Sequence, residues 1–227
     1  MDLENKTTFI SGGGKNIGRS IALNLAGSGS NIVLNGATDL DACNKTATDV
    51  EKLGVKTMVL MGNVGSSDEV RTMSEKAINH FGSIDIVINN AAIRPSKPFL
   101  EMTDADWHNV LDIDLNSAFY TCRAFAGGML EKGWGRIVNI TGMNAIHGYK
   151  GRAPVSAAKH GLWGLTKSLG KEFGASGITT NAISPGPIDT DGDHPQREHI
   201  LSMVPRVPLG RLGKPEEIAA LTGFLCS

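Results

Sequence analysis

The chain has 227 residues, of which 41% are hydrophobic and 20% charged, and its formal net charge at pH 7 is −1. This length suits one α/β domain with a sizeable core, and the balanced charge excludes a strongly basic surface for nucleic acid or an anionic membrane. The three cysteines (Cys43, Cys122, Cys226) lack metal-ligand spacing, no apolar run approaches ~18 residues, and the first residues have no targeting pattern. We therefore expect a cytoplasmic protein that binds no metal.

Short apolar runs alternate with longer amphipathic stretches along the whole chain. We expect strands at Thr7–Ile10, Asn31–Asn35, Lys56–Leu60, Ile84–Asn89, Arg136–Thr141 and Ile178–Ser184. We expect helices near Ile17–Ser28, Asp39–Leu53, Ser67–Phe81, Asp104–Glu131 and Pro154–Ala175. This alternation predicts an α/β fold: a single doubly wound, Rossmann-like domain over residues 1–227. Its parallel sheet should have the order 3-2-1-4-5-6, with a ligand crevice at the carboxyl ends of the strands.

The first expected strand runs directly into SGGGKNIGRSIALNLA, residues 11–26. Glycines at such a turn let backbone N–H groups approach a phosphate, and the start of the next helix adds a favourable dipole. A plain tight turn can also be rich in glycine. The position between a strand and a helix in the first βαβ unit favours dinucleotide binding over that alternative.

This turn resembles the Thr-Gly-x-x-x-Gly-x-Gly pattern of the short-chain dehydrogenase/reductase family, with two departures. Ser11 replaces the threonine and keeps a hydroxyl group. Asn16 replaces the middle glycine, and asparagine is the side chain that most readily adopts left-handed backbone angles. We therefore expect the turn to keep its shape.

Three further motifs extend the resemblance over nearly the whole chain, and the overall pattern is most similar to 3-oxoacyl-[acyl-carrier-protein] reductases. They are GNV (62–64), NNAA (89–92) and NAISPGPIDTD (181–191). The resemblance implies a nicotinamide dinucleotide held by Ser11, Gly12, Gly14, Lys15, Asn16, Ile17, Gly18, Thr38, Asn63, Val64, Asn90, Ala91, Lys159, Pro185, Gly186, Ile188 and Thr190. It also implies a substrate lid near residues 189–210, with Pro195 and a following short helix over the cleft. The last strand usual in the family is missing, so we expect a truncated or absent tail.

The resemblance places the family's catalytic residues at positions that have changed in this sequence. Lys159 matches the lysine that holds the nicotinamide ribose, but the tyrosine position four residues earlier is Val155. The serine position, thirteen residues before that, is Gly142, and the asparagine position on the preceding long helix is Asp114. The sequence thus keeps the residues for a cofactor and lacks the usual groups for proton transfer.

Three interpretations remain open for this combination. In the first, the protein is an NAD(P)-dependent oxidoreductase acting on a small or medium carbonyl or alcohol substrate with a relocated proton donor. In the second, Lys159 and Asp114 serve non-redox chemistry such as enolisation, decarboxylation or elimination. In the third, the chain is a dinucleotide-binding module without activity, or an inactive subunit paired with an active one.

A relocated donor would come from the loop that joins Gly142 to Val155. Tyr149 lies in this loop, and His147 two residues earlier would titrate near neutral pH if exposed. Either residue can also be an ordinary loop residue. The other tyrosine, Tyr120, lies in the middle of a helix, where packing is the better interpretation.

For the cofactor we expect NADP, with NAD as the alternative. NAD-specific relatives carry an aspartate just after the second strand, which repels a 2′-phosphate, whereas this chain has Gly36 there, followed by Ala37 and Thr38. Lys15 stands where NADP-using relatives place a basic residue. Asp39 is the one nearby carboxylate that opposes this interpretation.

The remaining expectations concern the substrate, metals and assembly. Arg94 and the apolar lid residues indicate a carbonyl compound with an anionic or polar end; those lid residues are Ile200, Leu201, Met203 and Val204. DTDGDH (189–194) resembles the start of a calcium loop but lacks its later glycine and glutamate, so we expect no metal. The resemblance implies a homotetramer or homodimer, with Trp107, Phe119, Phe125 and Trp163 as possible interface groups.

Overall fold

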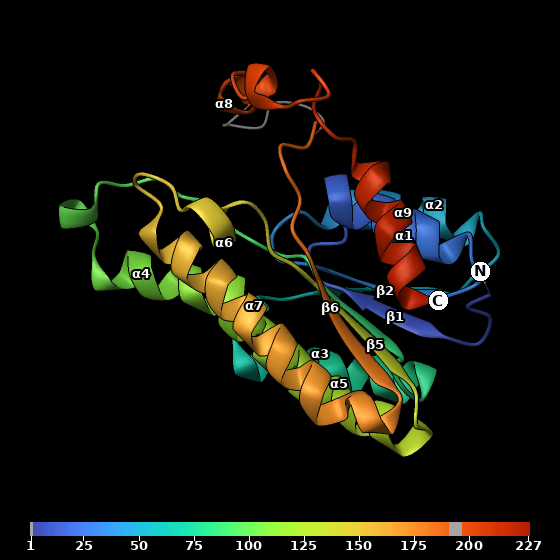
Figure 1. The fold of residues 1–227 in the computed structure, drawn as a ribbon. Helices are drawn as coiled ribbons and strands as arrows, with labels where there is room; N and C mark the ends of the chain where they lie inside the picture. The colour runs from blue at the N-terminus through green and yellow to red at the C-terminus, as the bar shows by residue number, and fades with distance from the viewer. Residues whose placement is uncertain (1, 191–196) are drawn as a thin grey trace.

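Six parallel strands form one sheet in the order β3-β2-β1-β4-β5-β6, which confirms the predicted order. The strands are β1 (Thr7–Ile10), β2 (Asn31–Gly36), β3 (Thr57–Met61), β4 (Ile86–Asn89), β5 (Gly135–Ile140) and β6 (Ile178–Ile183). The computed structural model describes residues 2–190 and 197–227 (Figure 1). The bounds differ from the expected ones by a few residues at most, because short apolar runs mark strands well and their ends poorly.

Neighbouring residues of the strands point to opposite faces of the sheet, and both faces are apolar. Ile10, Leu34 and Ile88 belong to the core on one face. Phe9, Val33 and Val87, each one residue earlier, belong to the core on the other face. A parallel sheet buried on both sides requires such continuous apolar runs, so the alternation of side chains accounts for both cores.

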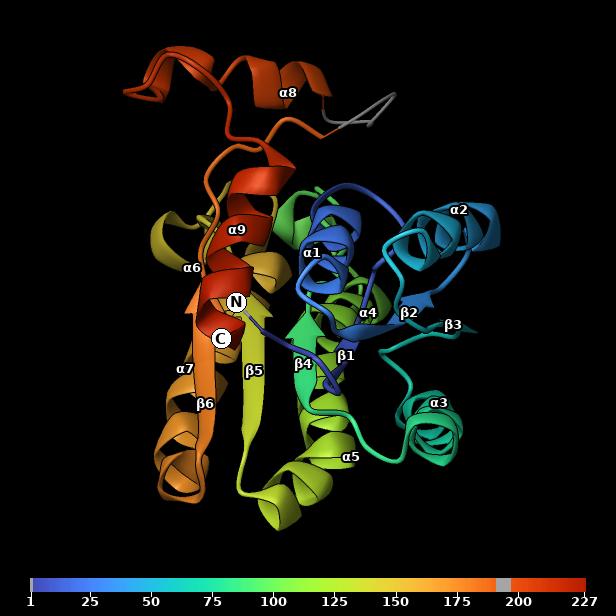
Figure 2. The same ribbon diagram turned by 90° about the vertical axis from the view of Figure 1, so that its right-hand side faces the viewer.

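Helices cover both faces (Figures 1 and 2). The core that contains Ile10 is covered by α1 (Asn16–Ala26), α2 (Leu40–Glu51) and α9 (Pro215–Cys226). The opposite core is covered by α3 (Ser67–Phe81), α5 (Ser117–Lys132) and α7 (Ala153–Phe173). Figure 2 shows the arrowheads of β4, β5 and β6 at the same edge, with α6 (Asn144–His147) beside it and α8 (Arg197–Leu201) above it. Because all six strands are parallel, their carboxyl ends lie at one edge of the sheet.

The helix expected at Asp104–Glu131 is interrupted. It comprises α4 (Asp104–Leu111), a π-helical turn η2 (Asp112–Asn116) and α5. A π-helical turn is often found at a functional site, and this one contains the buried Asp114. Sequence periodicity did not indicate the interruption, because both helical segments continue the same amphipathic pattern.

The prediction that Phe125 is an interface residue is wrong. Phe125 is 3% exposed and its ring packs 5.1 Å from that of Phe9, so it belongs to the core. Phe119 and Trp163 are exposed on α5 and α7, and a subunit interface on these helices stays a prediction. Within residues 2–190 and 197–227, no helix is long and apolar enough to cross a bilayer, and no cluster of His, Cys, Asp and Glu could hold a metal ion.

A buried hydrogen-bonded chain of polar side chains joins the sheet to α5 and α7. Asn89 Nδ2 donates to Asn139 Oδ1 at 2.8 Å, and Thr121 Oγ1 donates to Asn89 Oδ1 at 2.6 Å. Asn139 Nδ2 in turn donates to Thr166 Oγ1 at 2.9 Å. Because each buried group has a partner, the network fixes two helices against the middle of the sheet at little cost.

We expect Thr166→Val to destabilise the protein by about 1–3 kcal/mol, because valine keeps the shape of threonine and leaves the buried Asn139 amide without its acceptor. The measurement is urea unfolding at equilibrium. The matched control is Thr72→Val on the exposed face of α3, where the change should stay within about 0.5 kcal/mol. Equal values for the two variants would contradict a stabilising role of the network.

Candidate active site

The glycine-rich turn after β1 is shaped by close backbone contacts. Gly12 has φ +62° and Asn16 has φ +49°, so asparagine adopts the left-handed conformation expected from the sequence. A Cβ at Gly18 would lie 2.1 Å from the carbonyl oxygen of Gly12, and one at Gly12 would lie 3.2 Å from Cα of Ala91. Only glycine fits these contacts, which bring the first turn of α1 against the chain after β4. The turn has the shape expected of a cradle for a dinucleotide pyrophosphate, whose binding here stays a prediction.

Ser11 and Asn90 hold this turn in place. The Ser11 hydroxyl accepts hydrogen bonds from the backbone N–H groups of Asn90 and Ala91, at 2.9 and 3.0 Å. The Asn90 amide donates to the carbonyl oxygens of Ser11 and Gly12, both at 3.0 Å. Both side chains thus position the cradle from within, and their predicted contact with the cofactor stays a prediction.

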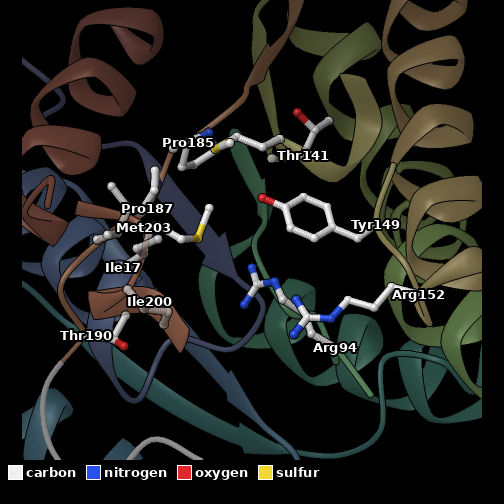
Figure 3. A pocket seen from close by; sticks show the side chains of 14 residues that line it. Ile17, Arg94, Thr141, Tyr149, Arg152, Pro185, Pro187, Thr190, Ile200 and Met203 are labelled. Atoms are coloured by element: carbon white, nitrogen blue, oxygen red, sulfur yellow. The ribbon is translucent and has the colours of Figure 1, made fainter. Parts of the chain in front are cut away.

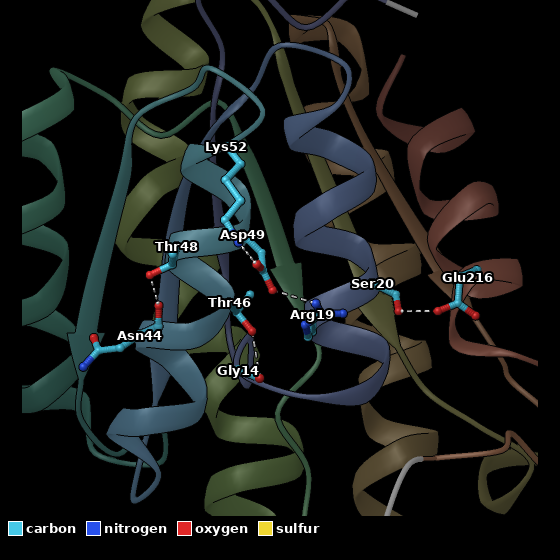
Figure 4. Close-up of polar contacts among 9 residues, drawn as sticks. All are labelled: Gly14, Arg19, Ser20, Asn44, Thr46, Thr48, Asp49, Lys52 and Glu216. Carbon is cyan, nitrogen blue, oxygen red and sulfur yellow. Dashed lines mark hydrogen bonds and ion pairs between the residues drawn. The ribbon is translucent and has the colours of Figure 1, made fainter.

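Helices α1, α2 and α9 are tied to the same turn (Figure 4). Thr46 Oγ1 of α2 donates to the carbonyl oxygen of Gly14 at 2.9 Å. Arg19 and Asp49 form an ion pair at 2.8 Å between α1 and α2, and the Ser20 hydroxyl donates to Glu216 of α9 at 3.1 Å. The cradle is therefore supported by helices on both of its sides.

Lys15 and Asp39 lie where we expect the adenosine half of the cofactor, and their ion pair affects the choice between NADP and NAD. Lys15 pairs with Asp39, and this bond lowers the pKa of the Asp39 carboxyl group. A Cβ at Gly36 would lie 2.5 Å from Cys43 Sγ, so the packing of Cys43 leaves no room for an aspartate at the end of β2. Thr38 and Asn63 are exposed, whereas Val64 is buried.

Lys159 is buried in α7, with 2% of its surface exposed. Its Nζ donates to the carbonyl oxygen of Ile140 at 3.1 Å and lies 3.6 Å from Asp114 Oδ2. Asp114 Oδ1 accepts a hydrogen bond from the backbone N–H of Ile93 at 2.8 Å. Burial lowers the pKa of Lys159 and raises that of Asp114, and each charge opposes the shift of the other. The two groups predicted from different helices thus form one buried pair.

The two neighbouring positions that the resemblance linked to proton transfer contain no hydroxyl group. Val155, one helical turn before Lys159, is fully buried. Gly142 has φ +125°, a backbone conformation that strains any residue with a side chain. A serine at Gly142 would therefore require a change of the local backbone, and the loop is built around glycine.

A pocket opens at the carboxyl edge of the sheet (Figure 3). It brings Ile17 of the first turn together with Gly142 and with four residues predicted to bind the cofactor, namely Pro185, Gly186, Ile188 and Thr190. Ile200 and Met203 of the expected lid also line it, and Leu201 is exposed. Pro195 and the stretch 191–194 of the calcium-like motif lie outside the described residues. The pocket joins segments from both halves of the sequence.

Of the two loop residues proposed as proton donors, Tyr149 lies at the pocket. Its ring projects inward, with the hydroxyl group towards Pro185 and Met203 (Figure 3). His147 is exposed at the end of α6 and is not among the residues that line the pocket. Tyr120 packs partly buried against the core that contains Phe9, as its place in the helix indicated.

Sequence reasoning missed four residues of this pocket, namely Thr141, Met143, Arg152 and Pro187. Arg152 lines it three residues after Tyr149, and its guanidinium lies 5.8 Å from the tyrosine ring centre. Thr141 also lines it, but its hydroxyl donates to the carbonyl oxygen of Ile183 at 3.1 Å. The GYKGR sequence contained the signal for Arg152, since a loop that brings in Tyr149 also brings in its near neighbours.

Comparison with known proteins identifies the family of the chain. The sequence pattern of the family described as enoyl-(acyl-carrier-protein) reductase matches residues 12–227. The chain is 38% identical to a 3-oxoacyl-[acyl-carrier-protein] reductase of Pseudomonas aeruginosa, covering all of this chain and 92% of that protein. The chain belongs to the short-chain dehydrogenase/reductase family. This family member is accordingly an NAD(P)-dependent oxidoreductase.

Other relatives agree with this assignment. An acetoacetyl-CoA reductase of Cupriavidus necator is 36% identical over 98% of this chain and 91% of its own. A crystal structure of a dehydrogenase/reductase from Sinorhizobium meliloti superimposes with a TM-score of 0.91 at 30% identity, over all of this chain and 89% of that one. An acetoin dehydrogenase of Salmonella typhimurium superimposes with a TM-score of 0.90 at 28% identity, over 98% and 88%. Family membership thus extends across nearly the whole chain.

We expect Asp114→Asn to destabilise this oxidoreductase by about 3 kcal/mol at pH 7, because the buried ammonium of Lys159 loses its counter-charge. In the folded variant the pKa of Lys159 would fall further below the ordinary lysine value of about 10.4. At a pH between these two values Lys159 is neutral in the folded state and protonated in the unfolded state, so unfolding takes up a proton over a wider pH range than in the parent. The stability of the variant should therefore rise with pH, and its deficit should shrink as pH approaches about 10. Urea unfolding across this pH range measures both effects.

Asp112→Asn is the matched control for this prediction. Asp112 lies in the same π-helical turn, is half-buried and accepts a hydrogen bond from Asn116 Nδ2 at 2.8 Å. Its replacement should cost at most about 1 kcal/mol and show no comparable rise with pH. A pH-independent deficit in Asp114→Asn would show that the Lys159 charge is not what Asp114 stabilises.

Proposed function

We propose that the chain reduces the carbonyl group of a small or medium-sized substrate with NADPH, and that Tyr149 donates the proton to the carbonyl oxygen. The observation that carries this proposal is the Tyr149 hydroxyl, which points into the pocket shared with the glycine-rich turn and the Pro185–Thr190 segment (Figure 3). Relatives named as 3-oxoacyl and acetoacetyl reductases support an oxo group on a short carbon chain as the reacting group.

The cofactor would lie along the carboxyl edge of the sheet. Gly12, Gly14 and Gly18 would hold the pyrophosphate, and Ile188 and Thr190 would contact the nicotinamide half. Lys159 would bind the nicotinamide ribose from beneath the pocket, where its ammonium is already fixed by Ile140 and Asp114. When bound, the dinucleotide supplies a hydride to the carbonyl carbon.

Proton transfer completes the reduction. As the carbonyl oxygen gains negative charge, the Tyr149 O–H bond breaks and the proton moves to that oxygen, which gives an alcohol and a phenolate. The Arg152 guanidinium, 5.8 Å from the ring centre, would stabilise the phenolate. Tyr149 is only half-buried, so water can return the proton and regenerate the phenol.

Non-redox chemistry by Lys159 and Asp114 is less well supported. Both side chains are almost fully buried, face each other, and are not among the described residues that line the pocket. A substrate in the pocket would therefore meet Tyr149 before either of them. The relatives found by comparison are reductases and dehydrogenases, which likewise favours redox chemistry.

We expect Tyr149→Phe to reduce turnover by about 10²–10⁴-fold, the usual contribution of general acid–base catalysis. The measurement is NADPH oxidation with acetoacetyl-CoA and a panel of short ketones. Cofactor affinity should be unchanged, because the glycine-rich turn and Lys159 provide it. Tyr120→Phe is the matched control, since Tyr120 packs away from the pocket. Activity that survives Tyr149→Phe combined with His147→Ala would refute a donor in this loop.

NADP preference depends on Lys15, which a 2′-phosphate would have to share with Asp39. Both side chains are largely exposed, so their ion pair is weak and exchangeable. The carboxylate of Asp39 nevertheless competes with a phosphate for the same ammonium and repels it. Lys15 should therefore favour NADPH, and Asp39 should reduce that preference.

We expect Lys15→Ala to weaken NADPH binding by about 5–10-fold, corresponding to roughly 1 kcal/mol for an exposed charge pair, and to leave NADH binding unchanged. Asp39→Asn should strengthen NADPH binding by a similar factor. Titration calorimetry at low salt measures both dissociation constants, and Lys45→Ala on α2 controls for net charge. Equal affinities of the parent for NADPH and NADH would contradict this assignment.

A further inference from the structure

The pocket carries two arginines, of which the proposed reduction uses only Arg152, as a charge near the Tyr149 phenolate. Arg94 follows the NNAA motif in the loop after β4, and Arg152 immediately precedes α7. Both line the pocket, and in Figure 3 their guanidinium groups extend inward on the side from which Tyr149 enters. The residues come from segments almost sixty positions apart, so their convergence is a property of the fold.

The two guanidinium groups are close enough to interact. Burial and then the charge of Arg94 lower the pKa of Arg152, and Arg94 also acts on the buried Lys159. Among the described residues that line the pocket, Arg94 and Arg152 are the charged ones, and neither aspartate nor glutamate occurs with them. Arg94 has interactions within the protein, but a guanidinium has five N–H donors and can bind an anion at the same time. An anionic group entering this pocket would reduce the repulsion between the two arginines.

The segments that present the arginines are fixed to one another. The backbone N–H of Lys97 donates to the carbonyl oxygen of Gly151 at 2.9 Å. Gly151 has φ +75°, and a Cβ there would lie 2.8 Å from Ser96 Oγ, so the turn before Arg152 packs directly on the loop of Arg94. This contact holds the two backbone segments that present the arginines against each other.

The loop of Arg94 is also anchored from below. The backbone N–H of Ile93, the preceding residue, donates to the buried Asp114 Oδ1 at 2.8 Å. Asp114 therefore positions Arg94 as well as pairing with Lys159. Guanidinium groups presented from two anchored loops match the planar, bidentate geometry of a carboxylate.

The reacting group would lie next to this anion site. The backbone N–H of Arg152 donates to the carbonyl oxygen of Tyr149 at 3.1 Å, so the expected proton donor and the arginine occupy one tight turn. The opposite side of the pocket is mainly apolar, with Ile17, Ile200 and Met203 beside Thr190 (Figure 3). A bound molecule would thus have a charged end at the arginines, an oxygen at Tyr149 and a short carbon chain against the apolar side.

We propose that Arg94 and Arg152 bind a carboxylate group of the substrate itself, which makes the substrate a short oxo acid rather than a neutral ketone or a thioester. This inference rests on the proposed reduction at Tyr149 and specifies its substrate class. The reaction balances as a two-electron reduction: the oxo carbon receives a hydride from NADPH, the oxygen receives the Tyr149 proton, and the carboxylate is unchanged.

The first test compares acetoacetate with its methyl ester, acetoacetyl-CoA and the phosphate ester of hydroxyacetone in NADPH oxidation. We expect kcat/KM for acetoacetate to exceed that for the methyl ester by at least about 10²-fold, since two charge-assisted contacts are lost in the ester. In Arg94→Gln and Arg152→Gln, this ratio should fall about 10-fold each, mainly through KM for the acid. Arg123→Gln on the exposed face of α5 is the matched control and should keep the ratio.

The second test measures binding without turnover. Acetoacetate is titrated into the protein in the presence of NADP⁺, with which an oxo acid cannot be reduced, and the heat of binding is recorded. Binding of the acid should weaken at least about 10-fold in the double variant Arg94→Gln/Arg152→Gln and should not change in Arg123→Gln.

The outcomes separate the two proposals. Arginine-dependent binding of acetoacetate without reduction of any oxo acid would refute the proposed function and support the anion site. Reduction of the ester or thioester as efficient as that of the acid would support the function and overturn this inference. A preference for the phosphate ester, or an equal loss of acid and ester turnover in the arginine variants, would also overturn it.

Discussion

A single carboxylate, that of Asp114, determines how the site is assembled. One of its oxygens faces the buried ammonium of Lys159 and the other accepts the backbone N–H of Ile93. A buried charge is tolerated only with such partners, so α7, the π-helical turn and the loop after β4 must keep a fixed arrangement. The π-helical turn serves this requirement, because it places Asp114 against both partners within an otherwise continuous helical segment. The Asn89–Asn139–Thr166 hydrogen bonds support the same arrangement from the sheet.

Much of the fold and the shape of the glycine-rich turn could be predicted from the sequence, because their signals are local. Strand order followed from the alternation of apolar runs and helices, and the left-handed Asn16 followed from the residue type at a glycine position. The interruption at Asp112–Asn116 and the burial of Phe125 could not be predicted in this way. An amphipathic pattern shows that a face is apolar, but it does not distinguish the core of the chain from an interface between chains.

The pocket was harder to predict, since its residues meet only through tertiary contacts. Tyr149 was a candidate from its position in the loop, whereas His147, the last residue of α6, is exposed and is not among the described residues that line the pocket. The signal for Arg152 was its nearness to Tyr149 in the sequence, but its place beside the loop of Arg94 depends on the packing of Gly151 against Ser96. Such a contact between two loops leaves no periodicity in either of them. Sequence reasoning therefore found the residues of the cradle more completely than those of the pocket.

The charges around the pocket relate the unusual residues Asp114, Val155 and Gly142 to one another. Because Asp114 pairs with Lys159, the ammonium beneath the pocket is largely compensated and contributes less to stabilising negative charge above it. Val155 and Gly142 add no polar group at that point. In the mechanism we propose, the positive charge needed around a developing alkoxide and a tyrosine phenolate would come instead from Arg94 and Arg152. The proposed donor and the charges that support it would thus lie in the turn before α7 and in the loop after β4, rather than on the helix that contains Lys159.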